Sequence, residues 1–155
     1  MIEISDVRSG RGALARAILG DLQEWFGIPA SVDNYVAECE CLPVLAARVD
    51  GAAVGFLALK IHTPVAAEAF VLGVKRAWHR RGCGRALFVA AEQRLAAQGV
   101  RFLTVKTLDA SHPDPDYAAT RMFYEAIGFE PIEVFPTLWS ADNPCLLMLK
   151  PIKAH

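Results

Sequence analysis

The sequence predicts an α/β fold built on one mixed, largely antiparallel sheet of about seven strands, flanked by about four helices. Apolar residues alternate at strand spacing in some segments and recur at helical spacing in others, in the order βααβββαβαββ along the 155 residues. Glycine and proline interrupt the pattern between segments. Because the chain is 54% hydrophobic and contains no repeat, low-complexity tract or linker, we expect a single domain over residues 1–155.

The first part of the chain predicts one strand and two helices. The segment MIEISDV alternates apolar and polar residues, as a strand does. Apolar residues then recur at helical spacing: Leu14, Ile18, Leu22 and Trp25. Gly27 and Pro29 end this pattern. Ser31 is a candidate N-cap for a second helix that extends to about Glu38.

Three strands follow these helices. The segments LPVLAARV and AVGFLALKIH are separated by the turn DGA, which is typical of a tight β-hairpin. AEAFVLGV is the next strand. If its extended geometry is unbroken, Glu68, Phe70, Leu72 and Val74 share one face.

Helices and strands alternate in the rest of the chain. Residues 82–98 predict a helix that Gly99 ends, and VRFLTVKTL predicts a strand. The proline-rich loop DASHPDPD leads to a helix over YAATRMFYEAIG. Its buried face is expected to hold four residues: Ala119, Met122, Phe123 and Ala126. FEPIEVF and CLLMLK form the last strand pair, separated by the loop PTLWSADNP.

Charge, hydropathy and cysteine spacing narrow the function classes. The net charge of −1 gives no electrostatic reason to expect a nucleic-acid partner. The first residues have no signal-peptide pattern, and no apolar run approaches the roughly 20 residues that cross a bilayer, so we expect a cytoplasmic protein with no membrane partner. Of the four cysteines only Cys39 and Cys41 are close in sequence, so free thiols and no metal site are expected.

The segment WHRRGCGRALF, residues 78–88, joins a strand to a helix and indicates an anion site. Unpaired amides at a helix start and the helix dipole favour negative charge. Gly82 and Gly84 are expected to let a phosphate approach the backbone, with Arg80, Arg81 and Arg85 at the rim. The segment fits neither the dinucleotide fingerprint nor the Walker loop. A simple basic helix start is the alternative.

Two motifs resemble the GNAT superfamily of acetyl-CoA-dependent N-acetyltransferases. VLGVKRAWHRRGCGRALF is similar to a strand followed by that family's [RQ]-x-x-G-x-[GA] pyrophosphate loop. About forty residues later, ATRMFYEAIGF is similar to its F-Y-x-x-x-G-F helix and strand. The resemblance covers nearly the whole chain. It implies a GNAT-like sheet with a splayed strand pair that binds acetyl-CoA.

The resemblance also implies where the cofactor binds. The backbone of Leu72, Gly73 and Val74 would pair with the pantetheine arm, and a bulge in AEAFVLGV would supply the splay. The residues of the pyrophosphate loop would be His79, Arg80, Arg81, Gly82, Cys83, Gly84, Arg85 and Ala86. His79 stands where the family has Arg or Gln. Tyr117 stands where many members have an asparagine that contacts the arm, so that contact stays unassigned.

Acetyl transfer needs an acid, an oxyanion donor and a route for the amine proton. Tyr124 falls on the family's tyrosine position and is the candidate acid for the leaving thiolate; packing beside Phe123 is the alternative. Glu68 precedes His79 by the offset of the catalytic glutamate in histone-modifying members. With apolar neighbours its pKa would be raised toward a general base's range, and a water relay is the alternative. An amide of Val74 or Leu72 is the candidate oxyanion donor.

Two further residues and the acceptor site complete the predictions. Cys83 is expected to turn into the core rather than act as a nucleophile, and His112 is expected to be solvated. The acceptor would contact residues of the first two helices and of the last loop: Trp25, Tyr35, Glu38, Trp139 and Asp142.

The sequence therefore predicts direct acetyl transfer in a ternary complex to a primary amine, with a small molecule as the acceptor. A protein amino group is the alternative acceptor, and a non-catalytic acyl-CoA sensor is the alternative class. We expect a monomer or a homodimer.

Overall fold

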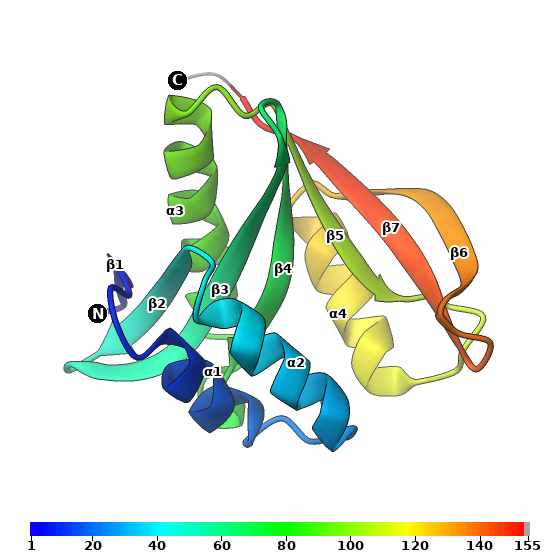
Figure 1. Cartoon of the computed structure of the whole chain (residues 1–155), viewed down its shortest axis with the longest axis horizontal. Coiled ribbons are helices and arrows are strands. Elements are labelled where there is room, and N and C mark those ends of the chain that lie inside the picture. Colours follow the sequence, from blue (N-terminus) through cyan, green and yellow to red (C-terminus); the bar gives the residue numbers. More distant parts are fainter. Residues whose placement is uncertain (154–155) are drawn as a thin grey trace.

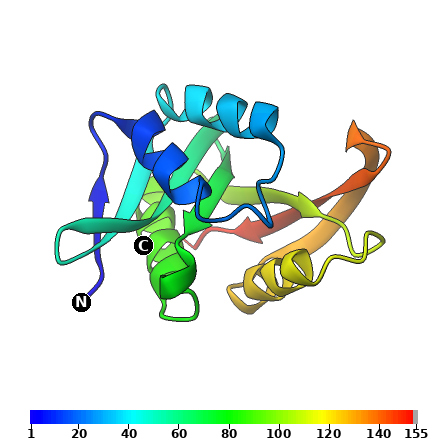
Figure 2. The same ribbon diagram turned by 90° about the horizontal axis from the view of Figure 1, so that it is seen from below.

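The computed structural model describes residues 1–153 and contains one seven-stranded sheet between two layers of helices (Figure 1). Its strands are β1 (Glu3–Asp6), β2 (Val44–Val49), β3 (Ala52–Thr63), β4 (Ala66–Val74), β5 (Phe102–Leu108), β6 (Glu130–Ser140) and β7 (Asn143–Pro151). Its helices are α1 (Arg11–Leu19), α2 (Pro29–Cys39), α3 (Cys83–Ala97) and α4 (Pro115–Ala126), with a 3-10 turn, η1 (Arg76–Trp78). Figure 2 shows α1 and α2 on one face and α3 and α4 on the other.

The predicted element order and the mixed sheet are confirmed. The strands lie in the order β1-β2-β3-β4-β5-β7-β6, and β4 with β5 is the parallel pair between otherwise antiparallel neighbours. The β2–β3 hairpin forms as predicted, because Asp50 (φ 50°) and Gly51 (φ 82°) both adopt the left-handed backbone that a tight hairpin turn needs. Among residues 1–153, no helix has the length and hydropathy needed to cross a bilayer.

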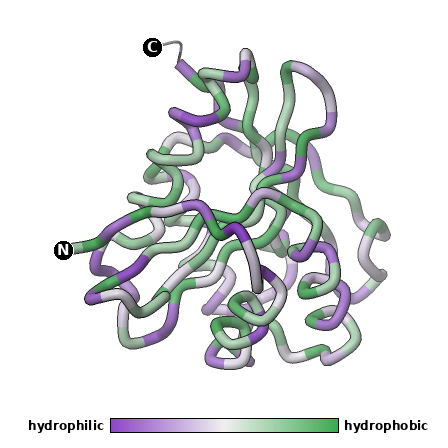
Figure 3. Tube along the Cα trace, turned by 60° about the vertical axis from the view of Figure 1, so that its left-hand side comes forward, coloured by the Kyte–Doolittle hydropathy of each residue, from purple (hydrophilic) through white to green (hydrophobic). Residues whose placement is uncertain are grey.

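Alternating strand residues divide the core into two clusters, one on each face of the sheet. Leu57, Leu87 and Phe88 belong to the cluster under α3 and α4, whereas Ile18 and Phe56 belong to the one under α1 and α2. Figure 3 shows the hydrophobic colour running along the central strands between the helices. Both faces of the sheet are therefore covered at strands β2 to β4, as the apolar character of these strands requires.

Three details differ from the sequence-based expectations. Helix α2 begins at Pro29 with Ile28 at the N-cap, so Ser31 lies inside the first turn and is not the cap. The predicted loop before the last strand is largely strand, because β6 continues to Ser140. The predicted inner face of α4 is wrong for Ala119, Met122 and Ala126, which are exposed, whereas Phe123 packs against the core as predicted. Met122 is 71% exposed, and Tyr124 is the buried residue of the helix.

A bulge in β4 interrupts the face that was expected to run from Glu68 to Val74. Ala58 of β3 pairs with Val71, and the next residue, Leu59, pairs with Ala69, so Phe70 is the extra residue. Leu72 and Val74 consequently pack toward α3, whereas Phe70 packs toward α1 and α2. Glu68, flanked by two alanines of the α3 cluster, faces the same side as Phe70.

The aromatic core under α3 provides a stability test. Phe88 is 1% exposed and its ring contacts Phe123, Tyr124 and Phe129 at centroid distances of 5.6 to 6.1 Å. Phe88→Ala should lower the free energy of unfolding by about 3 to 5 kcal/mol, because a large cavity remains. The neighbouring Val89 is 51% exposed, so Val89→Ala should change it by less than about 0.5 kcal/mol. Urea denaturation measures both, and equal effects would contradict this core assignment.

Candidate active site

The site is built around a gap between β4 and β5, which we call the splay. These strands pair over three residues only, from Ala66 with Phe102 to Glu68 with Thr104, and then diverge (Figure 1). The amide of Lys75 donates to Val54 of β3, so by strand alternation the amides of Leu72 and Val74 point away from β3. The edge of β4 that faces the splay is left unpaired by β5.

The start of α3 lies directly beyond the end of β4. Gly82 is the N-cap residue with φ 89°, and no side chain among the described residues caps the helix. The amides of Cys83, Gly84 and Arg85 have no carbonyl partner within the helix. Arg80 also has a left-handed backbone (φ 61°), which is uncommon for a residue with a side chain. Successive amides in such a turn form a concavity that binds anions.

Gly84 and Cys83 serve packing in this helix start. A Cβ on Gly84 would lie 2.9 Å from the ring of Phe123, so this glycine allows α4 to approach α3; its predicted contact with phosphate stays a prediction. Cys83 is buried in the α3 cluster, and burial raises the pKa of its thiol despite the nearby Arg81. A buried thiol of this kind is a poor nucleophile, in agreement with the expected core orientation.

His79 turns back toward the end of β4. Its Nε2 lies 2.6 Å from the carbonyl oxygen of Val74, and because a carbonyl only accepts, Nε2 carries the hydrogen. The ring also packs edge-to-face against Trp25 at 5.6 Å. His79 therefore joins the end of β4 to the loop between α1 and α2.

The loop between α1 and α2 also reaches α4 through Trp25. The indole Nε1 of Trp25 donates to Oγ1 of Thr120 (3.2 Å), and the hydroxyl of Tyr117 donates to the carbonyl of Trp25 (2.7 Å). Tyr117, which replaces the family's asparagine, thus holds this loop. Burial, the largest cause, raises the pKa of Tyr117 to about 12.

Tyr124 lies in the aromatic cluster of the α3 face. It is 6% exposed and its ring contacts Phe88 and Phe129. Burial raises the pKa of its phenol, and the neighbouring Tyr117 and Tyr35 raise it further. Its hydroxyl has no hydrogen-bond partner among residues 1–153 and remains protonated well above neutral pH. Both the predicted acid role and the packing alternative are compatible with this position.

Glu68 lies at the vertex of the splay, at the last paired position of β4. Its Oε1 lies 2.7 Å from Nε2 of His62 and 3.2 Å from Nζ of Lys106. The expectation of apolar surroundings for this carboxylate is therefore wrong, because two basic side chains contact one of its oxygens. They come from the strands on either side of β4.

The structure brings together only some of the residues predicted for the acceptor. Tyr35 packs on Phe70 beside Glu68 (5.5 Å between ring centroids), and Glu38 forms an ion pair with Lys60 (3.1 Å) on the same face. Trp25 lies farther along, against His79 and α4. Trp139 is in the exposed strand β6 and Asp142 is in the turn before β7, and within residues 1–153 neither forms a hydrogen bond, ion pair or aromatic contact with the other three.

Sequence reasoning missed two residues of this site, Lys106 and His62, and the backbone conformation of a third that it had named, Arg80. The sequence does contain an indication for Lys106, because a lysine inside the apolar strand FLTVKTL needs a polar or charged partner. Nothing in the sequence indicates the role of His62, because the direction of its side chain depends on a bulge in β3 that the alternation pattern does not show. The left-handed backbone of Arg80 also left no trace in the residue types.

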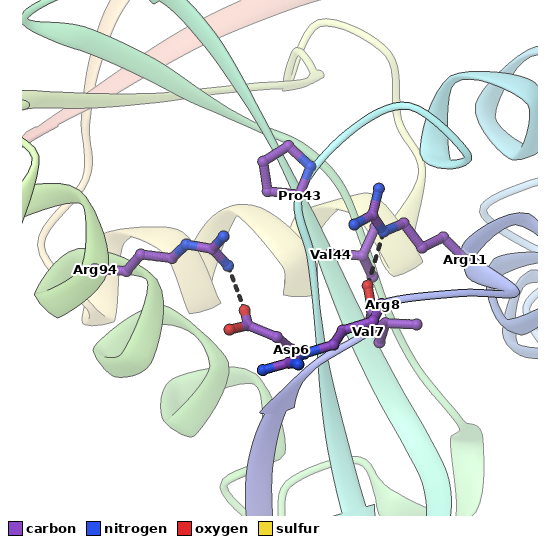
Figure 4. A pocket seen from close by; sticks show the side chains of 7 residues that line it. All are labelled: Asp6, Val7, Arg8, Arg11, Pro43, Val44 and Arg94. Atoms are coloured by element: carbon purple, nitrogen blue, oxygen red, sulfur yellow. Dashed lines mark hydrogen bonds and ion pairs between the residues drawn. The ribbon is translucent and has the colours of Figure 1, made fainter.

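Two other features lie away from this site. A surface pocket between β1, α1 and α3 is lined by three arginines and by Asp6, which forms an ion pair with Arg94 (Figure 4). A second pocket lies between α1 and α2, near Arg16 and Phe26. Within residues 1–153 no group of three histidine, cysteine, aspartate or glutamate side chains is arranged to hold a metal ion, and all four cysteines are free.

A sequence profile of the GNAT acetyltransferase domain matches residues 35–131, which is more than half of the chain. The protein therefore belongs to the GNAT acetyltransferase family. A search of curated protein sequences finds no match.

Solved structures share the fold. A protein assigned to the GNAT family, from Desulfovibrio desulfuricans, is similar with a TM-score of 0.83 and 20% identity over 99% of this chain and 100% of its own. The ribosomal-protein-S18-alanine N-acetyltransferase from Escherichia coli is similar with a TM-score of 0.77 and 21% identity, over 100% of this chain and 96% of its own. An aminoglycoside 6′-N-acetyltransferase in complex with coenzyme A is similar with a TM-score of 0.76 and 19% identity, over 99% of this chain and 98% of its own. These identities establish likeness of fold and leave the acceptor open.

The buried Tyr117 predicts a pH dependence of stability. Its pKa is about 12 in the folded protein against about 10 when unfolded, so unfolding releases a proton between these values. The stabilisation is fully present below pH 10 and is lost as pH rises toward 12, by up to about 1.4 kcal/mol per pH unit. Urea denaturation at pH 9 to 12 should show this fall, and Tyr117→Phe should make it shallower. An unchanged slope in the variant would exclude Tyr117 as its source.

Proposed function

We propose that residues 1–155 form a single N-acetyltransferase domain that transfers an acetyl group from acetyl-CoA to a primary amine. The observation that carries the proposal is the continuity of two backbone surfaces, the unpaired edge of β4 and the uncapped, glycine-led start of α3. One suits a chain with amide groups, and the other suits a pyrophosphate. The buried position of Cys83 supports direct transfer in a ternary complex, because this cysteine of the helix start is a poor nucleophile for carrying the acetyl group.

The described residues fit coenzyme A. The open space over Gly82 would admit phosphate oxygens, since a Cβ there would meet no atom within 4 Å, and the left-handed Arg80 lies two residues before it in the same turn. Arg81 and Arg85 would supply charge. When bound, acetyl-CoA supplies an activated acetyl group as a thioester. No metal is required by this chemistry.

The chain's own residues would supply the protons and hold the amine. Tyr124 keeps its hydroxyl hydrogen at neutral pH because burial raises its pKa, so it suits the role of proton donor to the leaving thiolate. Amides of Leu72 and Val74, aimed into the splay, suit the developing oxyanion. Glu68 suits the removal of the amine proton, and the water relay remains the alternative.

Charges near the vertex favour a small amine as the acceptor. Glu38 pairs with Lys60 and Glu68 pairs with Lys106, so both carboxylates are already balanced by lysines. A compact monoamine that contacts Tyr35 suits this surface better than a polycation does. A protein amino group is the second candidate acceptor, and a non-catalytic acyl-CoA sensor is the alternative class. We further propose a cytoplasmic monomer or homodimer with no nucleic-acid or membrane partner.

Two glycines with the same backbone strain test the cofactor site. Gly82 (φ 89°) and Gly99 (φ 84°) both have open space where a Cβ would be, so an alanine at either position should cost about 1 to 2 kcal/mol of stability through strain. Only Gly82→Ala should also weaken acetyl-CoA binding, by about tenfold or more in calorimetry. No binding of acetyl-CoA by the wild-type protein would overturn the proposed function. Equal binding by the two variants would remove Gly82 from the site.

Tyr124 provides the test of turnover. Thiol release from acetyl-CoA is followed over a panel of mono- and polyamines and an N-terminal peptide, which also separates the acceptor classes. Tyr124→Phe should lower kcat by about 10²-fold or more, because an acid is lost, while acetyl-CoA affinity is retained. The phenyl ring of the variant still packs on Phe88. Unchanged kcat would exclude Tyr124 as the acid, and binding without release for any amine would favour the sensor.

A further inference from the structure

His62 occupies a special position in the sheet. Ile61 of β3 pairs with Ala67 and Thr63 pairs with Ala66, so His62 is the extra residue of a second bulge. A bulge re-aims the side chain of its extra residue. Here it directs the imidazole to Glu68, with Nε2 at 2.7 Å from Oε1.

The two partners differ sharply in exposure. The side chain of Glu68 is 5% exposed, whereas that of His62 is 42% exposed. A buried carboxylate at the vertex of the splay is thus linked by one hydrogen bond to a ring that reaches solvent. Lys106, the other partner of Oε1, ends in an ammonium, which donates hydrogen bonds and has no acceptor. Of the two contacts, only the imidazole has one nitrogen that can accept a hydrogen and another that can donate one.

We propose that His62 carries the acceptor's proton from Glu68 to solvent. This inference rests on the proposed function. The N–H bond of the acceptor breaks as its proton moves to the carboxylate of Glu68. The carboxyl then passes one proton to Nε2 of a neutral His62 whose hydrogen is on Nδ1, and the Nδ1 proton leaves to water. Glu68 is again a carboxylate, and the neutral ring returns to its starting tautomer by exchange with solvent.

The groups around the pair support this route. Lys106 from β5 holds the carboxylate in place, and Lys60 on β3 is occupied by Glu38 of α2. Tyr35 of α2 and Cys145 of β7 face the same carboxylate, and burial raises the pKa of each, so both stay neutral below about pH 9. His62 is consequently the group of this set that can accept a hydrogen at one ring nitrogen and release one to water from the other.

The experiment measures thiol release with the amine that the wild-type enzyme acetylates fastest. His62→Ala and His62→Gln should each lower kcat by about 10- to 100-fold in buffers that transfer protons poorly, with KM for acetyl-CoA unchanged. Added imidazole should restore the rate of His62→Ala in proportion to its concentration. Glu68→Gln combined with His62→Ala should show no restoration, because the first step of the relay is missing.

The remaining variants separate proton transfer from structure. Gln at position 62 can still donate a hydrogen bond to Glu68 but cannot relay a proton, so wild-type kcat in His62→Gln would overturn the proposal. A rate of His62→Ala that imidazole leaves unchanged would overturn it too. Ile61→Ala, a change at an exposed neighbour in the bulge, should keep wild-type kcat and serves as the control. Absence of thiol release by the wild-type protein would instead overturn the proposed function.

Discussion

The early end of pairing between β4 and β5 is the constraint on which the site depends. Three backbone pairs hold the strands at one end, and beyond Glu68 each strand continues with a different partner, β3 for β4 and β7 for β5. A buried strand edge without partners is costly unless something else pairs with it. The unpaired edge of β4 is therefore the surface on which the proposed extended ligand would pair, and it leads directly to the start of α3. The bulge at Phe70 lies within this edge and separates residues that face the two layers.

The fold and the site were predictable to different degrees. Periodicity gave the element order and the hairpin at Asp50 and Gly51, because binary patterning and turn chemistry are local properties. The glycine at position 82 located the helix start for the same reason. The inner face of α4 was not predictable, since Tyr124 is inside and Met122 outside against their relative hydropathies. Tertiary packing on Phe88 decides that orientation.

The polar centre of the site depends on register, which local pattern does not determine. A one-residue insertion exchanges the faces of a strand, and β3 and β4 each contain one, at His62 and Phe70. These two insertions place Glu68 and His62 together and separate Glu68 from Leu72. The expectation of an apolar environment for Glu68 was wrong because it considered only the neighbours of Glu68 along β4. The hydrogen bonds to its carboxylate come from His62 on β3 and Lys106 on β5.

The bridge that Trp25 makes between two layers has a consequence for how a long ligand enters. On the α3 face the splay is crossed by packed rings, and separating Phe88 from Tyr124 and Phe129 would expose apolar surface at a cost of about 1.5 to 3 kcal/mol for each ring. On the α1 side the crossing consists of the hydrogen bonds from Trp25 to Thr120 and from Tyr117 to Trp25, together worth about 1 to 3 kcal/mol. Opening the α1 side would therefore cost less than separating the rings of the aromatic core. For the proposed acetyl-CoA, the tryptophan loop is the part that would move, while the aromatic core would hold the diverging strands apart.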